Sequence, residues 1–172
     1  SYRQIARALS LVPVGIPASV ANRLQPVPGD IPEGLDGLIV ASPGNPSGTM
    51  LDRAALAALM AHCRARGLAF ISDEIYHGLH YGSRAVSALE IADDCVVINS
   101  FSKYFSMTGW RIGWMVVPEA MVRGIERLQQ NLFICAPHAA QIAALAALDA
   151  TDELEANRAV YARNRALMLE HL

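Results

Sequence analysis

The sequence is poor in lysine, since its thirteen arginines are accompanied by a single lysine, Lys103. It has only three cysteines, no Cys-x-x-Cys pair, and a net charge of −2. These shortages argue against a disulfide framework, a zinc site and a nucleic-acid-binding surface. The alanine-rich apolar tract 139–147 is too short to cross a bilayer. We therefore expect a cytoplasmic protein that does not span a membrane, with Cys63, Cys95 and Cys135 reduced and buried.

The lone lysine is informative because arginine cannot replace it chemically. A guanidinium stays protonated and forms no Schiff base, whereas a lysine amine can be tuned to do so. An arginine-biased composition would also leave lysines rare, so the neighbouring residues have to decide. Lys103 stands in the stretch 99–105, Asn-Ser-Phe-Ser-Lys-Tyr-Phe, between two serines and two aromatic residues.

The chain alternates strand-like and helix-like segments, as α/β domains do. It is 53% apolar and 17% charged, a composition typical of one globular domain with a sizeable core. Strands are expected at 11–16, 37–41, 68–72, 95–99 and 111–117. Helices are expected at 2–9, 52–66, 119–132 and 138–148, with a last one that Asp152 caps and that runs to residue 172. The pattern predicts a mostly parallel sheet flanked by helices, with Trp110 and Trp114 packed in the core.

Two of the predicted strands end in polar loops. The first loop, 42–49, reads Ser-Pro-Gly-Asn-Pro-Ser-Gly-Thr and is either a plain turn or a ligand loop in which Asn45 donates and accepts hydrogen bonds. The second places Asp73 at a strand end with Tyr76 three residues later. A carboxylate can keep a heterocyclic nitrogen protonated, and a phenol can bind an oxygen of the same ring; alternatively, Asp73 caps a helix. Parallel strands bring such loops to one edge, where ligands bind.

A third loop adds cationic and hydroxyl groups. Ser100 and Ser102 flank Phe101 just before Lys103, and Arg111 follows eight residues after the lysine. Two hydroxyls and a forked guanidinium suit a phosphate, and Lys103 would supply an amine beside it. Each residue also has an ordinary structural interpretation, but their joint arrangement favours a phosphate-bearing ligand.

Two other patterns are weaker. Ser100-x-x-Lys103 matches the S-x-x-K of penicillin-binding serine enzymes, but the lysine of their K-T-G motif is missing and the motif follows a strand instead of opening a helix. His77 and His80 form an H-x-x-H pair without a third ligand nearby in sequence, so we expect no metal site. Tyr81 either borders a substrate pocket or packs.

These stretches resemble the class I and II pyridoxal-phosphate-dependent aminotransferases, the aspartate-aminotransferase-like group of fold type I. The resemblance rests on Ser-Pro-Gly-Asn-Pro-Ser-Gly-Thr, on Ser-Asp-Glu-Ile-Tyr, and on Ser-Phe-Ser-Lys-Tyr-Phe-Ser-Met-Thr-Gly-Trp-Arg-Ile-Gly, in that order. It covers nearly the whole chain, and the third stretch is highly specific. It implies an enzyme that moves an amino group from an amino acid to a 2-oxo acid.

The resemblance also implies a role for each candidate residue. Lys103 would carry pyridoxal 5′-phosphate as a Schiff base and shuttle the proton of the substrate α-carbon. Asp73 would pair with the pyridinium nitrogen, while Tyr76 and Asn45 would bind the phenolic oxygen and lower the Schiff-base pKa. The phosphate would be bound by three further residues, Ser100, Ser102 and Arg111.

By the same resemblance, residues 1–150 would be part of the cofactor-binding large domain. Residues 151–172 would begin a long helix that leads to a small C-terminal domain. We expect the 172 residues to belong to a larger homodimeric polypeptide and to be inactive alone. The resemblance implies that two strands are absent, one of them from between strands that are present, which would leave a gap and exposed apolar surface. Two other readings stay open: a lyase on the same fold and a ligand-sensing domain of a regulator.

Overall fold

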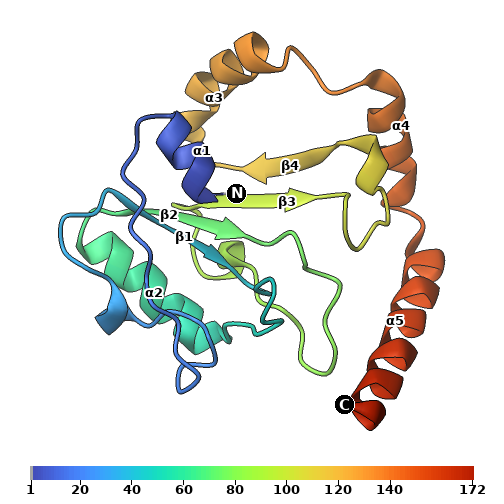
Figure 1. Cartoon of the computed structure of the whole chain (residues 1–172). Helices are drawn as coiled ribbons and strands as arrows, with labels where there is room; N and C mark the ends of the chain where they lie inside the picture. The colour runs from blue at the N-terminus through green and yellow to red at the C-terminus, as the bar shows by residue number, and fades with distance from the viewer. Residues whose placement is uncertain (1) are drawn as a thin grey trace.

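The computed structural model describes residues 2–172 as a four-stranded sheet with helices around it (Figure 1). The strands are β1 (Gly37–Ala41), β2 (Ala69–Asp73), β3 (Val96–Ser100) and β4 (Gly113–Val116). The helices are α1 (Tyr2–Ala8), α2 (Arg53–Ala65), α3 (Glu119–Leu132), α4 (His138–Ala147) and α5 (Thr151–His171), and three short 3₁₀ turns are η1 (Pro28–Asp30), η2 (Ala88–Glu90) and η3 (Thr108–Trp110).

The sheet has the strand order β1-β2-β3-β4, and the predicted gap between strands is therefore wrong. The strands β1, β2 and β3 are parallel, with Ala41 opposite Asp73 and Asp73 opposite Ile98. The last strand, β4, runs antiparallel to β3, with Gly113 opposite Ser100. The predicted mostly parallel α/β sheet is confirmed, since three of its strands are parallel and one is antiparallel. An antiparallel neighbour needs only a short connection, and the segment that contains η3 provides it.

The helix α2 covers one face of the sheet. Asp52 caps it by accepting a hydrogen bond from the Ala55 N–H at 2.9 Å, and Gly67 follows its end with φ +68°, as the sequence predicts. The main core joins α2 to the sheet and consists of thirteen buried residues: Ile31, Leu38, Val40, Leu51, Leu56, Leu59, Met60, Cys63, Leu68, Phe70, Ala88, Cys95 and Val97. On the other face, Ile39 and Ile98 are exposed.

Four expectations about local structure are wrong. The segment 11–16 is irregular: Pro13 lacks the N–H that a central strand needs, and the sheet does not include this segment. The last strand begins at Gly113, because Arg111 is left-handed with φ +52°. The last helix begins at Thr151 after Ala150, so Asp152 lies in its first turn and does not cap it. Trp110 in η3 and Trp114 in β4 are 48% and 37% exposed, so neither is packed in the core.

The three cysteines differ in their exposure to solvent. Cys63 and Cys95 are buried and Cys135 is exposed, so the expectation of three buried thiols fails for Cys135, which lies between α3 and α4. Burial raises the pKa of both Cys63 and Cys95. Among residues 2–172, no helix is both long and apolar enough to cross a membrane.

Candidate functional site

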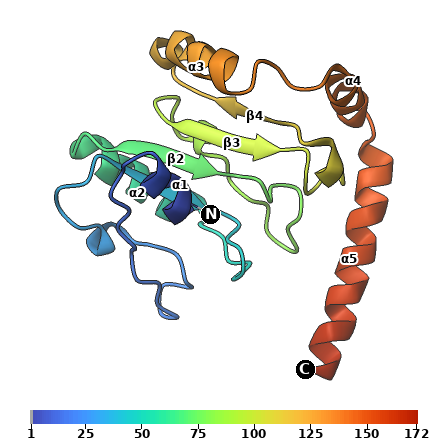
Figure 2. The same cartoon turned by 45° about the horizontal axis from the view of Figure 1, so that its top comes forward.

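The carboxyl ends of β1, β2 and β3 point toward the same edge of the sheet, on the side where α5 runs (Figures 1 and 2). The loop with Asn45 leaves β1, Asp73 is the last residue of β2, and Ser100 is the last residue of β3. The predicted convergence of these loops is confirmed by direct contacts between them, which are described below. They bring together residues up to 58 positions apart, from Asn45 to Lys103.

Lys103 lies in the turn that leaves β3. Its Nζ lies 5.5 Å from the centroid of the Tyr76 ring, at cation–π distance. The turn is anchored on both sides of the lysine by the buried side chains of Phe101 and Met107, and the Met107 N–H donates to the Phe101 carbonyl at 3.0 Å. The amine therefore stands on an anchored turn, within cation–π distance of Tyr76.

Asn45 and Tyr76 contact each other across two loops. The Asn45 Nδ2 donates to the Tyr76 hydroxyl at 3.0 Å. Because the hydroxyl accepts this bond, its own proton remains available to a further acceptor. An amide and a phenol held together in this way form a paired donor site for one oxygen atom.

Asp73 is held by two donors. Its Oδ1 accepts the Ile75 N–H at 3.1 Å, and its Oδ2 accepts the hydroxyl of Tyr2 from α1. Burial, and then the hydrogen bond to Asp73, raise the pKa of Tyr2, so the phenol keeps its proton and remains a donor. Sequence reasoning missed Tyr2, because nothing local links residues that stand 71 positions apart.

Ser100 and Ser102 form a hydroxyl pair. Their Oγ atoms are 2.9 Å apart, and the Ser102 N–H donates to the Ser100 Oγ at 3.1 Å. The Ser100 Oγ also lies 3.2 Å from the carbonyl of Ile112, so the pair abuts the chain that enters β4. Thr108 adds a hydrogen bond from its hydroxyl to the Ser102 carbonyl. The turn therefore presents two hydroxyls close together.

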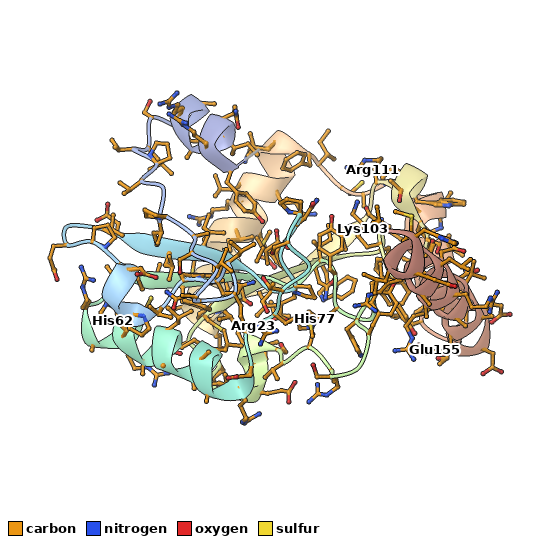
Figure 3. All side chains as sticks on the ribbon, turned by 60° about the horizontal axis from the view of Figure 1, so that its bottom comes forward. Arg23, His62, His77, Lys103, Arg111 and Glu155 are labelled. Atoms are coloured by element: carbon orange, nitrogen blue, oxygen red, sulfur yellow. The ribbon has the colours of Figure 1, made fainter. Side chains whose placement is uncertain are left out.

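Arg111 directly precedes Ile112, whose carbonyl contacts the Ser100 hydroxyl. Its left-handed backbone conformation turns the chain from η3 into β4, and its Nη1 donates to the Thr108 carbonyl at 3.0 Å. A guanidinium has five N–H donors in a planar fork, which matches the oxygens of a phosphate. Figure 3 places Arg111 near Lys103, at the same end of the molecule.

A cleft of about 440 Å³ opens beside Asn45 and Tyr76. Its lining includes Tyr81 and, from α5, Arg165, whose guanidinium carbon lies 5.6 Å from the centroid of the Tyr81 ring. Tyr81 therefore borders this cleft. Arg165 was not predicted, because the sequence gives no signal that the last helix returns to this loop.

The two weaker sequence patterns fit the structure poorly. Ser100 ends a strand and a turn follows it, whereas the S-x-x-K motif of serine enzymes opens a helix. His77 and His80 face different surroundings: His77 contacts Glu74 and Ser42, while burial and then the charge of Arg158 lower the pKa of His80. Within residues 2–172, no group of three or more potential metal ligands comes together.

Comparison with known proteins places this arrangement in a family. The sequence model described as aminotransferase class I and II matches residues 1–172. The valine–pyruvate aminotransferase of Mycobacterium tuberculosis is 44% identical over 178 aligned positions, covering 99% of this chain and 46% of the relative. The arginine–pyruvate transaminase AruH of Pseudomonas aeruginosa is 43% identical over 76% of this chain and 34% of its own length.

The fold is shared as well. The crystal structure of a presumed aminotransferase from Silicibacter pomeroyi superposes with a TM-score of 0.95 at 67% identity, and covers all of this chain and 47% of the other. This chain thus spans about half the length of the valine–pyruvate aminotransferase and of the Silicibacter pomeroyi protein.

Proposed function

The chain belongs to the class I and II aminotransferases, and from this premise we propose that the protein containing it moves an amino group from an amino acid to a 2-oxo acid with pyridoxal 5′-phosphate on Lys103. The observation that carries the proposal is the meeting of three loops. Lys103 Nζ stands 5.5 Å from the Tyr76 ring, and Tyr76 accepts a 3.0 Å hydrogen bond from Asn45.

The donor set of the site fits this cofactor. Pyridoxal phosphate has an aldehyde, a phenolic oxygen, a ring nitrogen and a phosphate, and each would find one group of residues of matching chemistry. These groups are the Lys103 amine, the Asn45–Tyr76 pair, the Asp73 carboxylate, and the cluster of Ser100, Ser102 and Arg111. When bound, the cofactor would supply an electron sink for a carbanion at the substrate α-carbon.

Lys103 would act twice. Its amine would hold the cofactor covalently, and arginine could not replace it there. Once the substrate amine displaces it, the same Nζ would take the proton from the substrate α-carbon and return it on the cofactor side. The anchored turn between Phe101 and Met107 would keep the amine within reach during both steps.

Asp73 would keep the ring nitrogen protonated by charge pairing. The two hydrogen bonds that it accepts, from Ile75 and Tyr2, fix the orientation of its carboxyl group. Tyr2 would therefore be a positioning residue for Asp73.

The substrates of the whole protein also belong to the proposal. The two relatives from M. tuberculosis and P. aeruginosa carry pyruvate in their names and differ in the amino acid. We take pyruvate as the first acceptor to assay. The cleft beside Asn45, bordered by Tyr81 and Arg165, would lie next to the cofactor and contribute to the substrate side. The resemblance also implies that the whole protein is a homodimer.

The test is an absorbance spectrum of the full-length protein with pyridoxal phosphate. The wild type should show a band near the visible edge, and Lys103→Ala should lose it. Lys103→Arg is the matched control, because it keeps the charge without an amine nucleophile and should lose the band as well. A band that survives unchanged in both variants would sink the proposal. Product analysis with pyruvate then separates amino transfer from the release of ammonia by a lyase.

A further inference from the structure

A buried carboxylate follows Asp73 directly. Glu74 is 2% exposed, and its Oε1 accepts two hydrogen bonds, from the Ser72 hydroxyl at 3.0 Å and from the Ala88 N–H at 2.8 Å. A buried carboxylate without partners would be costly, so these donors explain how one oxygen is tolerated. The other oxygen, Oε2, faces His77 Nδ1 at 3.5 Å.

The imidazole of His77 bridges two segments. On one side its Nδ1 faces Glu74, and on the other its Nε2 lies 3.0 Å from the carbonyl of Ser42. A carbonyl only accepts hydrogen bonds, so Nε2 must carry a proton. With the side chain only 18% exposed, the ring is fixed at both ends.

Ser42 begins the loop that carries Asn45. The serine continues the parallel ladder, because its N–H donates to the Asp73 carbonyl at 3.1 Å, and its Oγ accepts the Leu51 N–H at 2.9 Å. Three residues later, Asn45 donates to Tyr76. The segments 42–45 and 74–77 are therefore joined by two cross-links, a part-buried one through His77 and an exposed one through Asn45.

The two cross-links differ in what supports them. The contact between Asn45 and Tyr76 is open to solvent, where a single hydrogen bond holds a loop weakly. The imidazole of His77 contacts the buried Glu74 carboxylate on one side and the Ser42 carbonyl on the other. It is therefore the better-supported link between the two segments. Figure 3 shows His77 below Lys103, nearer the middle of the molecule.

We propose that His77 is a positioning residue for Asn45: braced by Glu74, its imidazole holds the 42–45 loop where the Asn45 amide reaches the oxygen site beside Tyr76. This inference rests on the proposed function, because it assigns Asn45 to the phenolic oxygen of the cofactor. Both nitrogens of His77 are engaged in these contacts, one with Glu74 and one with the Ser42 carbonyl.

The experiment follows the pH at which the absorbance band of the Lys103-bound cofactor changes in the full-length protein. Asn45→Ala removes a hydrogen bond to a charged oxygen, which corresponds to about one to two pH units of upward shift in this midpoint. His77→Phe keeps a ring without donors and should raise the midpoint by roughly half a unit to one unit, because Asn45 is displaced but not lost.

Two further variants make the test specific. His77→Gln can still reach the Ser42 carbonyl with an N–H donor and should restore most of the wild-type midpoint. If His77→Phe does not fold, His77→Gln still tests the role of the donor. His77→Phe in the Asn45→Ala background should add no further shift, because both changes act on one contact. His62→Gln, on α2 and remote from the site in Figure 3, should leave the midpoint unchanged.

The outcomes separate the two proposals. If the wild type shows no band, or Lys103→Ala keeps it, the proposed function fails. If the band behaves as proposed but His77→Phe leaves its midpoint at the wild-type value, the positioning role alone is overturned. A full additional shift of the double variant over Asn45→Ala would also overturn it, because His77 would then act independently of Asn45. The dissociation constant for pyridoxal phosphate, which should rise several-fold in His77→Phe, provides a second readout.

Discussion

The part of the molecule built on α2 and the part built on β4, α3, α4 and α5 are packed very differently. The first contains a cluster of thirteen buried residues, whereas the cluster next to α4 has three, Phe101, Met107 and Ala144. Within the described chain, all four residues of β4 are exposed, α3 buries none of its residues, and α5 buries only Leu154.

The candidate site lies where these two parts meet. Asn45, Asp73 and Tyr76 come from the well-packed part, whereas Arg111 comes from the chain that enters the exposed β4. An apolar surface as extensive as that of α3 and its surroundings is typical of a contact with other protein. The residues that we assign to the cofactor ring therefore lie beside the larger buried cluster, whereas Arg111, assigned to the phosphate, lies where fewer residues are buried.

The largest effect is expected from the packed part. Leu59 is fully buried under the sheet, and Leu59→Ala should lower the free energy of unfolding by about 2–5 kcal/mol. Leu128→Ala on α3 is the matched control, since the side chain is 61% exposed and the change should cost about 0.5 kcal/mol or less. Urea denaturation of the 172-residue chain measures both. Equal costs would remove the contrast between the two parts.

The second prediction tests the packing of Gly78 against Tyr104, in the turn that carries Lys103. Gly78 has φ +91°, and an added Cβ would stand 2.4 Å from Cγ of Tyr104, the residue after Lys103. Gly82 has a similar φ of +87° but nothing within 4 Å of its Cβ position. Both alanine variants are strained, so Gly78→Ala should cost about 1–3 kcal/mol more than Gly82→Ala through overpacking alone. Equal destabilisation in urea would show that Tyr104 does not pack on this glycine.

A smaller effect concerns the attachment of α5. The Tyr104 hydroxyl donates to Glu155 at 2.7 Å, and Tyr104→Phe should cost about 0.5–1.5 kcal/mol. Glu155 keeps its ion pair with Arg158, so amide hydrogen exchange should rise in the first turns of α5 and not throughout the helix. Tyr161→Phe, at a 44% exposed position of the same helix, is the control and should leave the exchange unchanged. Unaltered exchange in Tyr104→Phe would mean that α5 is held elsewhere.

The smallest effect is a pH dependence in the packed part. The hydrogen bond from Arg84 is the main reason that the pKa of Glu90 falls to about 2 from its ordinary 4.5. A lowered carboxyl pKa stabilises the fold above the ordinary value, and this contribution is lost as the pH falls from 4.5 toward 2. Because Glu90 is at the surface, the effect should be modest and weaken with salt.

Glu90→Gln should therefore be less stable than the wild type at pH 6, with a difference that shrinks below pH 4.5 and vanishes near pH 2. Thermal denaturation at low ionic strength over this range measures it. Glu170→Gln, at the exposed end of α5, should show no such trend. A difference that persists unchanged at pH 2 would contradict the role given to the Arg84–Glu90 contact.

Sequence reasoning succeeded where the signal is local. The strand Gly37–Ala41 and the helix Glu119–Leu132 have the predicted bounds, because a short apolar run and a helical spacing between prolines define them. Sequence reasoning failed where the structure of a segment depends on residues that are distant in sequence. The segment 11–16 is apolar without a strand partner, and Trp114 is exposed although tryptophan usually seeks a core. The gap in the sheet that the family resemblance implied was also wrong, because the four strands pair as direct neighbours in the order β1-β2-β3-β4.

For the site, the amino-acid sequence determined which chemical groups are present. The lone lysine, the Asp73-to-Tyr76 spacing and the serines beside Lys103 were enough to propose a Schiff base, a ring-nitrogen partner and a phosphate site. The tertiary structure decided which of them meet, and it added Tyr2 behind Asp73 and the bridge from Glu74 through His77 to Ser42. The physical reason is that side-chain chemistry belongs to each residue, whereas contacts between loops exist only after the sheet has paired its strands.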